Sequence, residues 1–190
     1  MIIGLSGYAR SGKDEAAIAL QDIGFHRVAF ADKLREVIYA LNPYVSPTKE
    51  NYFVNHKVPT TLQEVIDIYG WGGYKESPYS DEIRRLLQRL GTEAGRQTLW
   101  DSIWVDAAFA GAPPDANIVV TDCRFPNEAE AITKRGGEVW RITRPGVGPA
   151  NSHASETGLD DWKFDVRITN EGTLEDYHGL IREIAKSRLV

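Results

Sequence analysis

The chain has 190 residues, of which 42% are hydrophobic and 26% charged, and its 27 acidic and 22 basic side chains give a net charge of −5. A chain of this length and composition buries enough apolar surface to fold as one globular domain, so a disordered chain and a disulfide-dependent miniprotein are excluded. The acidic balance argues against binding of polymeric nucleic acid, because such binding depends on clustered Lys and Arg.

Cysteine usage and hydropathy predict the compartment. Cys123 is the single cysteine, and the sequence has no Cys/His cluster with zinc-ligand spacing. No stretch approaches 18 uninterrupted apolar residues, and the N-terminus lacks the apolar core of a secretion signal. We therefore expect a cytoplasmic protein that has no membrane partner.

The first 41 residues alternate between strand and helix patterns. Apolar residues predict a strand over 2–5, and an Ala-rich pattern predicts a helix over 16–20. A second strand is expected over 25–30 and a second helix over 33–41, which Asn and Pro then end. The chain therefore begins in the order strand, helix, strand, helix.

The middle of the chain differs in composition from the first part. After Pro43 it becomes rich in Pro, Gly, Tyr, Trp and Asn, and we interpret about 42–100 as an insertion into the core. A loop is expected over 70–73. Helices are expected over 62–69, 81–90 and 102–109.

The strand and helix alternation returns in the last third. The β-branched stretch 118–121 is typical of a parallel strand that is buried on both faces. The remaining expected elements are a helix over 126–135, strands over 139–143 and 166–169, and a final helix that opens with a capping box of Thr173 and Asp176. Strands separated by helices imply an α/β fold, in which helices flank a parallel sheet.

The segment GYARSGK, residues 7–13, matches the phosphate-loop pattern G-x-x-x-x-G-K between the first strand and the first helix. Glycines allow the backbone to turn its N–H groups toward phosphate, the helix N-terminus adds partial positive charge, and the Lys13 ammonium reaches the terminal phosphates. The pattern predicts a P-loop NTPase fold that binds nucleoside triphosphate. The predicted nucleotide-binding residues of this loop are Gly7, Arg10, Ser11, Gly12, Lys13, Asp14 and Glu15.

Two acidic residues are candidate magnesium ligands. Asp14 stands where phosphate loops usually have Ser or Thr, and a carboxylate can also ligate Mg²⁺. Asp122 follows the buried stretch 118–121, where it would face the phosphates from a neighbouring strand end, although an ordinary strand-end carboxylate has the same pattern. Arg124 lies two residues further on, and its guanidinium can brace phosphoryl oxygens. Cys123 between them is interpreted as a small buried side chain.

The sequence also narrows the class of P-loop protein. GTPases read their base with a tetrapeptide such as N-K-x-D, which is absent. A short chain with an insertion between the second and third core strands is instead typical of a kinase that acts on a small phosphorylated substrate.

Several segments resemble the deoxynucleoside monophosphate kinases of bacteriophages: GYARSGKD, FADKLRE, LQRLGTEAGRQ, VVTDCRFPNEAEAI, RITRPG with SHASE, and ITNEGTLED. They occur in that order and leave mainly 43–80 uncovered. The Lys-Asp ending of the loop is shared with that family, whereas Glu15 stands where Thr is expected. The resemblance implies ATP as phosphoryl donor, Mg²⁺ as cofactor, a deoxynucleoside monophosphate as acceptor, and the host cytoplasm as location if a phage encodes the chain.

The resemblance also assigns roles to individual residues. Similarity to other nucleoside monophosphate kinases implies a lid over about 144–158, whose Arg144 would close on the phosphates beside Lys13 and Arg124. Asn170 and Gly172 would lie near the donor adenine. By their place and chemistry in the chain, the candidate residues for the acceptor are Asp32, Lys33, Arg35, Gln88, Arg89, Arg96, Asp122 and Arg124.

Arg96 is the strongest candidate for the acceptor phosphate, because the resemblance places it in the family pattern and Gly95 beside it would allow close approach. Trp71, Trp100 and Trp104 could stack on a base, although tryptophans on helices are more often core residues. Exposed charge is the norm for Lys and Arg, so a solvated helix surface is the competing interpretation for the charged candidates.

Two other functions stay open at this point. One is a P-loop kinase of another small metabolite, such as a coenzyme precursor. The other is a nucleotide-sensing module without catalysis, against which the acceptor-side arginines argue, since a sensor needs no second anion site. A homodimer is also a candidate assembly.

Overall fold

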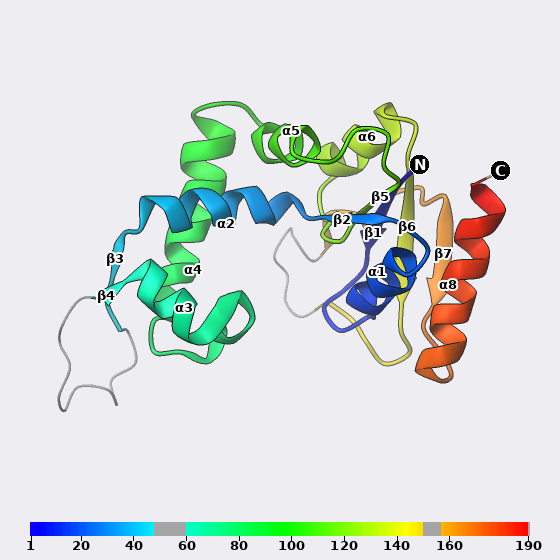
Figure 1. Cartoon of the computed structure of the whole chain (residues 1–190), viewed down its shortest axis with the longest axis horizontal. Coiled ribbons are helices and arrows are strands. Elements are labelled where there is room, and N and C mark those ends of the chain that lie inside the picture. The colour runs from blue at the N-terminus through cyan, green and yellow to red at the C-terminus, as the bar shows by residue number, and fades with distance from the viewer. Residues whose placement is uncertain (48–59, 150–156, 190) are drawn as a thin grey trace. The chain divides into compact units, whose positions relative to one another are not determined.

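The fold is described from a computed structural model, which covers residues 1–47, 60–149 and 157–189. The chain divides into two compact units (Figure 1). The first comprises Met1–Phe30 with Val105–Val190, and the second is Ala31–Trp104. The insertion predicted at about 42–100 lies within the second unit, which begins earlier and ends slightly later.

A parallel sheet of five strands, in the order β2-β5-β1-β6-β7, is the centre of the first unit. Its strands are β1 (Ile2–Ser6), β2 (His26–Val28), β5 (Ile118–Val120), β6 (Glu138–Thr143) and β7 (Val166–Thr169). Every neighbouring pair is parallel, so each connection must cross over the sheet through intervening structure. The predicted α/β fold with a parallel sheet is therefore confirmed.

Helices cover both faces of this sheet (Figure 1). Ile3 and Leu5 of β1 share a core cluster with α1 (Lys13–Gln21) and α8 (Leu174–Arg188). On the other face, Ile118 and Val120 pack with residues of α5 (Ile103–Ala110) and α6 (Pro126–Lys134). The alternation of side chains along each strand thus supplies two apolar faces, and each is covered by its own helical layer.

The second unit is mainly helical. Its elements are α2 (Phe30–Leu41), the short antiparallel pair β3 (Tyr44–Val45) and β4 (Thr60–Thr61), α3 (Leu62–Gly73), the 3₁₀ turn η2 (Tyr74–Glu76), α4 (Ser80–Gln88) and the π-helix η3 (Arg89–Gln97). Their apolar side chains form a core of their own around Ile38, Leu62 and Ile83. Across the parts of the chain that the structure describes, no helix has the length and apolar character needed to cross a membrane.

Three predicted boundaries are wrong for identifiable reasons. The second strand ends at Val28, because the Asp122 carboxylate accepts a hydrogen bond from Phe30 N and so starts α2 there. The loop expected at 70–73 is confined to Gly70, where a φ of 67° interrupts the helix, and α3 resumes over 71–73. The helix expected over 81–90 continues to Gln97 as a π-helix, whose wider turns the apolar pattern does not distinguish.

Candidate active site

The phosphate loop connects β1 to α1, as predicted (Figure 1). Close contacts require its two glycines. A Cβ atom on Gly7 would collide with the carbonyl oxygen of Ile142 in β6. A Cβ atom on Gly12 would collide with the Asn170 side chain, and Gly12 also has a positive φ of 106°. The loop backbone therefore packs directly against the ends of neighbouring elements, which only glycine permits.

Lys13 lies folded over this loop. Its Nζ donates hydrogen bonds to the carbonyl oxygens of Gly7 and Tyr8 at 2.7 and 2.8 Å. Gly12 is the N-cap of α1 and offers no side-chain acceptor. The N–H groups of the first helical turn, which have no partner within the helix, therefore point toward the loop without a capping side chain. Ser11 Oγ is buried and has no hydrogen-bond partner in the described part of the chain. An ammonium, helix N–H groups and an unsatisfied hydroxyl together suit an anionic, oxygen-rich ligand.

The C-terminal part of the chain supports the loop from outside. Asn170 Nδ2 donates to Ser11 O at 3.0 Å, and the Tyr177 hydroxyl donates to Gly12 O at 3.1 Å. Glu15 contacts His178 Nε2 on α8 at 2.9 Å. Asn170 thus supports the backbone of the phosphate loop. A contact of Asn170 or of the exposed Gly172 with the donor adenine stays a prediction.

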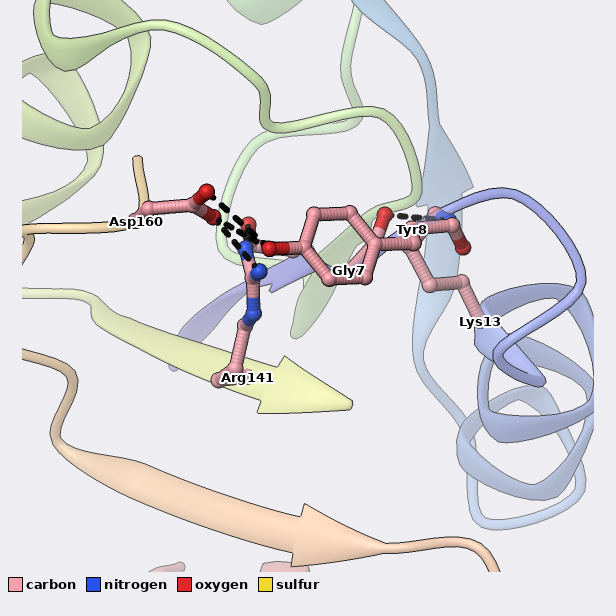
Figure 2. A network of polar contacts seen from close by, with 6 residues as sticks. Gly7, Tyr8, Lys13, Arg141 and Asp160 are labelled. Carbon is pink, nitrogen blue, oxygen red and sulfur yellow. Dashed lines mark hydrogen bonds and ion pairs between the residues drawn. The ribbon is translucent and has the colours of Figure 1, made fainter. Parts of the chain in front are cut away.

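Arg141, Asp160 and Tyr8 form a network that sequence reasoning missed (Figure 2). Arg141 lies in the middle of β6, and its guanidinium donates to Asp160 Oδ1 at 2.8 Å and to Ser6 Oγ at 3.3 Å. The Tyr8 hydroxyl donates to the same carboxylate at 3.0 Å. An Arg inside an otherwise apolar strand pattern was the available signal, because a buried cation needs a charged partner.

Asp122 and Arg124 follow β5 on a segment that a buried glutamate holds. Asp122 Oδ1 accepts from Phe30 N at 2.8 Å, while the Arg124 side chain is exposed. Glu128 Oε2 accepts from the backbone N–H groups of Arg124 and Phe125 at 2.7 and 3.0 Å. Glu128 is 3% exposed and was not predicted as a site residue. It fixes the backbone from which Arg124 projects.

Cys123 lies between these residues and is buried, as predicted. Burial raises the pKa of its thiol well above the usual value, and the nearby carboxylates of Glu128 and Asp122 raise it further. The neutral thiol is therefore favoured, which fits a packing residue and not a nucleophile.

The predicted lid begins directly after β6. Arg144 is exposed there, and a turn with an exposed Gly146 follows at 145–146. Residues 150–156, which include His153 and Glu156, lie outside the described part of the chain. The role of Arg144 as a residue that closes on phosphate therefore stays a prediction.

The predicted acceptor residues other than Asp122 and Arg124 belong to the second unit. On α2, Asp32 pairs with Arg35 at 3.2 Å and Lys33 with Glu36 at 2.6 Å. The Arg35 guanidinium also lies 5.7 Å from the centre of the Trp71 ring. These ion pairs within α2 are compatible both with a solvent-exposed helix start and with a binding surface, so they do not distinguish the two interpretations.

Gln88, Arg89 and Arg96 lie where α4 passes into η3. Gln88 and Arg89 are exposed, and Arg96 is half-buried. Arg89 pairs with Glu93 at 3.3 Å, and both line a cavity of about 420 Å³ within this unit. Its other lining residues are Ile38, Leu41, Pro43, Leu86, Leu90, Ala94 and Thr98.

Two glycines near Arg96, Gly91 and Gly95, lie on the π-helix where it meets Trp104. Trp104 Nε1 donates to Gly91 O at 2.8 Å, and a Cβ atom on Gly95 would lie 2.7–2.9 Å from the Trp104 ring. The expectation that Gly95 opens space for an acceptor phosphate is therefore wrong, because Trp104 fills that space. Trp104 is 7% exposed and acts as a packing residue here.

The candidate metal ligands have the donor atoms that Mg²⁺ prefers. Asp14 is exposed in the first turn of α1, and Asp122 lies at the end of β5. Among the residues described, no three His, Cys, Asp or Glu side chains gather in a group that could hold a metal ion. Mg²⁺ in nucleotide sites usually takes one or two carboxylates and completes its shell with phosphates and water, so two carboxylates suffice.

A parallel sheet whose first strand leads through a glycine-bounded, lysine-ending loop into a helix defines the class of P-loop nucleotide-binding proteins. In solved structures, the chain is similar to dephospho-CoA kinase from Campylobacter jejuni, with a TM-score of 0.47 and 13% identity over 98% of this chain and 96% of that chain. The class assignment itself rests on the sheet order and the loop.

Sequence comparison gives the family. The family model described as deoxynucleotide monophosphate kinase matches residues 74–181. A protein of Acanthamoeba polyphaga mimivirus, provisionally named as such a kinase, is 30% identical over 95% of this chain and 94% of its own length. The deoxynucleotide monophosphate kinase of Escherichia phage RB69 is 33% identical over 55% of this chain, which spans 45% of that protein. The chain belongs to the deoxynucleotide monophosphate kinase family.

Proposed function

We propose that this protein transfers the γ-phosphate of ATP to a deoxynucleoside monophosphate in the cytoplasm and releases the diphosphate. The observation that carries the proposal is that one chain combines two separate features. The phosphate loop at residues 7–13 supplies a donor site, and the family match over 74–181 covers Gln88, Arg89 and Arg96. A nucleotide sensor would need only the first of these features.

On the donor side, the loop N–H groups and the Lys13 ammonium would hold the phosphates of ATP. Lys13 already lies over the loop, where its hydrogen bonds to Gly7 O and Tyr8 O set the direction of the ammonium. Positive charge placed in advance stabilises the charge that develops on the moving phosphoryl group without reorganisation.

On the acceptor side, Arg96 would bind the monophosphate, with Arg89 and Gln88 beside it on the same helical stretch. Arg124 and Arg144 would neutralise the transferring group, and Asp122 would orient the acceptor or the metal shell. The acceptor phosphate is already ionised at neutral pH, so we assign no general base. Catalysis then consists of positioning two anions in line and neutralising their repulsion.

Magnesium would be held by Asp14 and Asp122 together with the nucleotide phosphates. When bound, Mg²⁺ would supply positive charge that offsets the negative charge of the donor phosphates. Asp14 adds a negative charge beside the phosphates, so we expect ATP binding to depend strongly on the metal. Chelation with EDTA should therefore weaken ATP binding itself and not only turnover.

The test is an acceptor panel. The protein is incubated with ATP, MgCl₂ and each of the four natural deoxynucleoside monophosphates, their ribose counterparts or a coenzyme precursor, and products are separated by anion-exchange chromatography. We expect deoxynucleoside diphosphate and ADP in equal amounts. Phosphorylation of the coenzyme precursor alone would favour the other kinase, and ATP binding without consumption of any acceptor would favour a sensor.

A further inference from the structure

Arg141 is a buried cation next to the phosphate loop. Its side chain is 7% exposed, and it lies beside Ser6 of β1, the residue that precedes the loop. The guanidinium is 4.5 Å from the centre of the Tyr8 ring and 5.5 Å from that of Phe164, with the Asp160 carboxylate as its ion-pair partner at 2.8 Å. This packing fixes both the guanidinium and the carboxylate in one geometry.

Tyr8 connects this ion pair to the phosphate loop (Figure 2). It is the second residue of the G-x-x-x-x-G-K segment, its ring lies against Arg141, and its hydroxyl donates to both carboxylate oxygens of Asp160 at 3.0 Å. Its backbone carbonyl accepts the Lys13 ammonium at 2.8 Å. A continuous chain of contacts therefore leads from Asp160 through Tyr8 to Lys13.

We propose that Asp160 is a positioning residue for phosphoryl transfer, which acts through the Tyr8 hydroxyl to hold the loop carbonyls that direct the Lys13 ammonium. This inference rests on the proposed function for its role in turnover, but its effect on the loop concerns ATP binding alone. The Asp160 carboxylate accepts hydrogen bonds from Tyr8 and Arg141, and of these two residues Tyr8 is the one that also contacts Lys13, so the proposed influence passes through Tyr8.

The Tyr8 hydroxyl separates this role from simple stabilisation of the fold. Neither the ion pair of Arg141 with Asp160 nor its contact with Ser6 involves that hydroxyl. The hydroxyl is thus not required to neutralise the buried cation. The Tyr8 hydroxyl instead attaches the phosphate loop to Asp160. This attachment is at the residue whose backbone carbonyl accepts the Lys13 ammonium.

The experiment compares Tyr8→Phe, Asp160→Asn and the double variant with the unmodified protein. Binding of MgATP is measured by calorimetry without acceptor, and KM for ATP and for the acceptor is measured at steady state. We expect Tyr8→Phe to weaken MgATP binding and lower kcat/KM for ATP by about tenfold, as for loss of one hydrogen bond to a charged group. The KM for the acceptor should stay within twofold. The double variant should lose no more MgATP affinity than the more impaired of the two single variants.

Asp161→Asn is the matched control, because it removes the neighbouring exposed carboxylate, and it should bind MgATP normally. If Asp160→Asn unfolds, Tyr8→Phe decides the question alone, since it leaves the ion pair intact. Normal MgATP binding and turnover by Tyr8→Phe would overturn the inference. If the unmodified protein phosphorylates no deoxynucleotide but Tyr8→Phe still weakens MgATP binding, the inference stands while the proposed function fails.

Discussion

At the scale of single residues, the proposed donor site depends on Lys13, which the phosphate-loop pattern predicts and whose Nζ donates to two loop carbonyls. Lys13→Ala should lower kcat by at least about 100-fold, because a preorganised charge at the reacting phosphate is removed. The fold should persist, with an unchanged thermal transition. Lys134→Ala removes an exposed lysine that pairs with Glu130 at 3.3 Å, and it should retain activity. Normal turnover by Lys13→Ala would remove the phosphate-loop assignment.

Arg96 is the residue that we propose for the acceptor phosphate. Arg96→Ala should raise the KM for the deoxynucleoside monophosphate by about 10- to 100-fold, as for loss of a charge-assisted hydrogen bond, and leave MgATP binding unchanged. Arg182→Ala, which removes an arginine that pairs with Asp22 at 3.3 Å, serves as the control. If Arg96→Ala loses MgATP affinity but keeps the KM for the acceptor, Arg96 serves the donor site and the proposed role is wrong.

At the scale of elements, the start of α8 shows how a local motif sets stability. Thr173 Oγ1 accepts from Asp176 N at 3.2 Å, and Asp176 Oδ2 accepts from Thr173 N and Oγ1 at 3.2 and 2.7 Å. These hydrogen bonds, the Thr173 hydroxyl first, lower the pKa of Asp176. A lowered folded-state pKa means that the ionised group adds stability above its unfolded pKa of about 3.9, and this stability is lost as the pH falls through the folded-state pKa.

Asp176→Asn should therefore unfold at lower urea concentration than the unmodified protein at pH 7, and the difference should narrow below about pH 4. Glu175→Gln neutralises the adjacent exposed acid in the same helical turn and should change the urea midpoint less. A midpoint difference for Asp176→Asn that is equal at pH 7 and pH 3 would contradict this role.

The π-helix η3 depends on small residues that meet Trp104. Gly95→Ala would place a methyl group 2.7–2.9 Å from the indole ring, so we expect a loss of about 1–3 kcal/mol in the free energy of unfolding. Gly72→Ala is the matched control, since nothing lies within 4 Å of its Cβ position, and it should be neutral or slightly stabilising in its helix. Thermal unfolding followed by circular dichroism distinguishes them, and equal transition temperatures would contradict the packing.

The same elements show what the sequence could predict. The phosphate loop, the buried stretch at 118–121 and the capping box of α8 are local patterns, so each was identified from neighbouring residues. The start of α2 was predicted late, because its N-terminal cap comes from Asp122, 92 residues away. The π-helix was missed because its apolar spacing resembles that of an α-helix, and its hydrogen bond to Trp104 is a tertiary contact.

At the scale of the whole molecule, the predicted site residues are divided between the two units. The unit that contains the parallel sheet includes Gly7 to Lys13, Asp122, Arg124, Arg144 and Asn170. The other unit includes the candidates on α2, α4 and η3. The Tyr8–Asp160 contact joins residues 152 positions apart, and no local pattern announces such a pair. Motifs therefore predicted the phosphate loop and its candidate residues, whereas contacts such as the one between Tyr8 and Asp160 depend on the fold.

The proposed reaction moves the γ-phosphate of ATP to a deoxynucleoside monophosphate on this chain. The most direct measurement follows γ-³²P from ATP in the presence of Mg²⁺ and the deoxynucleotide. We expect the label in the β-position of the deoxynucleoside diphosphate, in equal amount to the ADP formed. Label that appears only as inorganic phosphate, or that stays in ATP with every deoxynucleotide, would contradict the account.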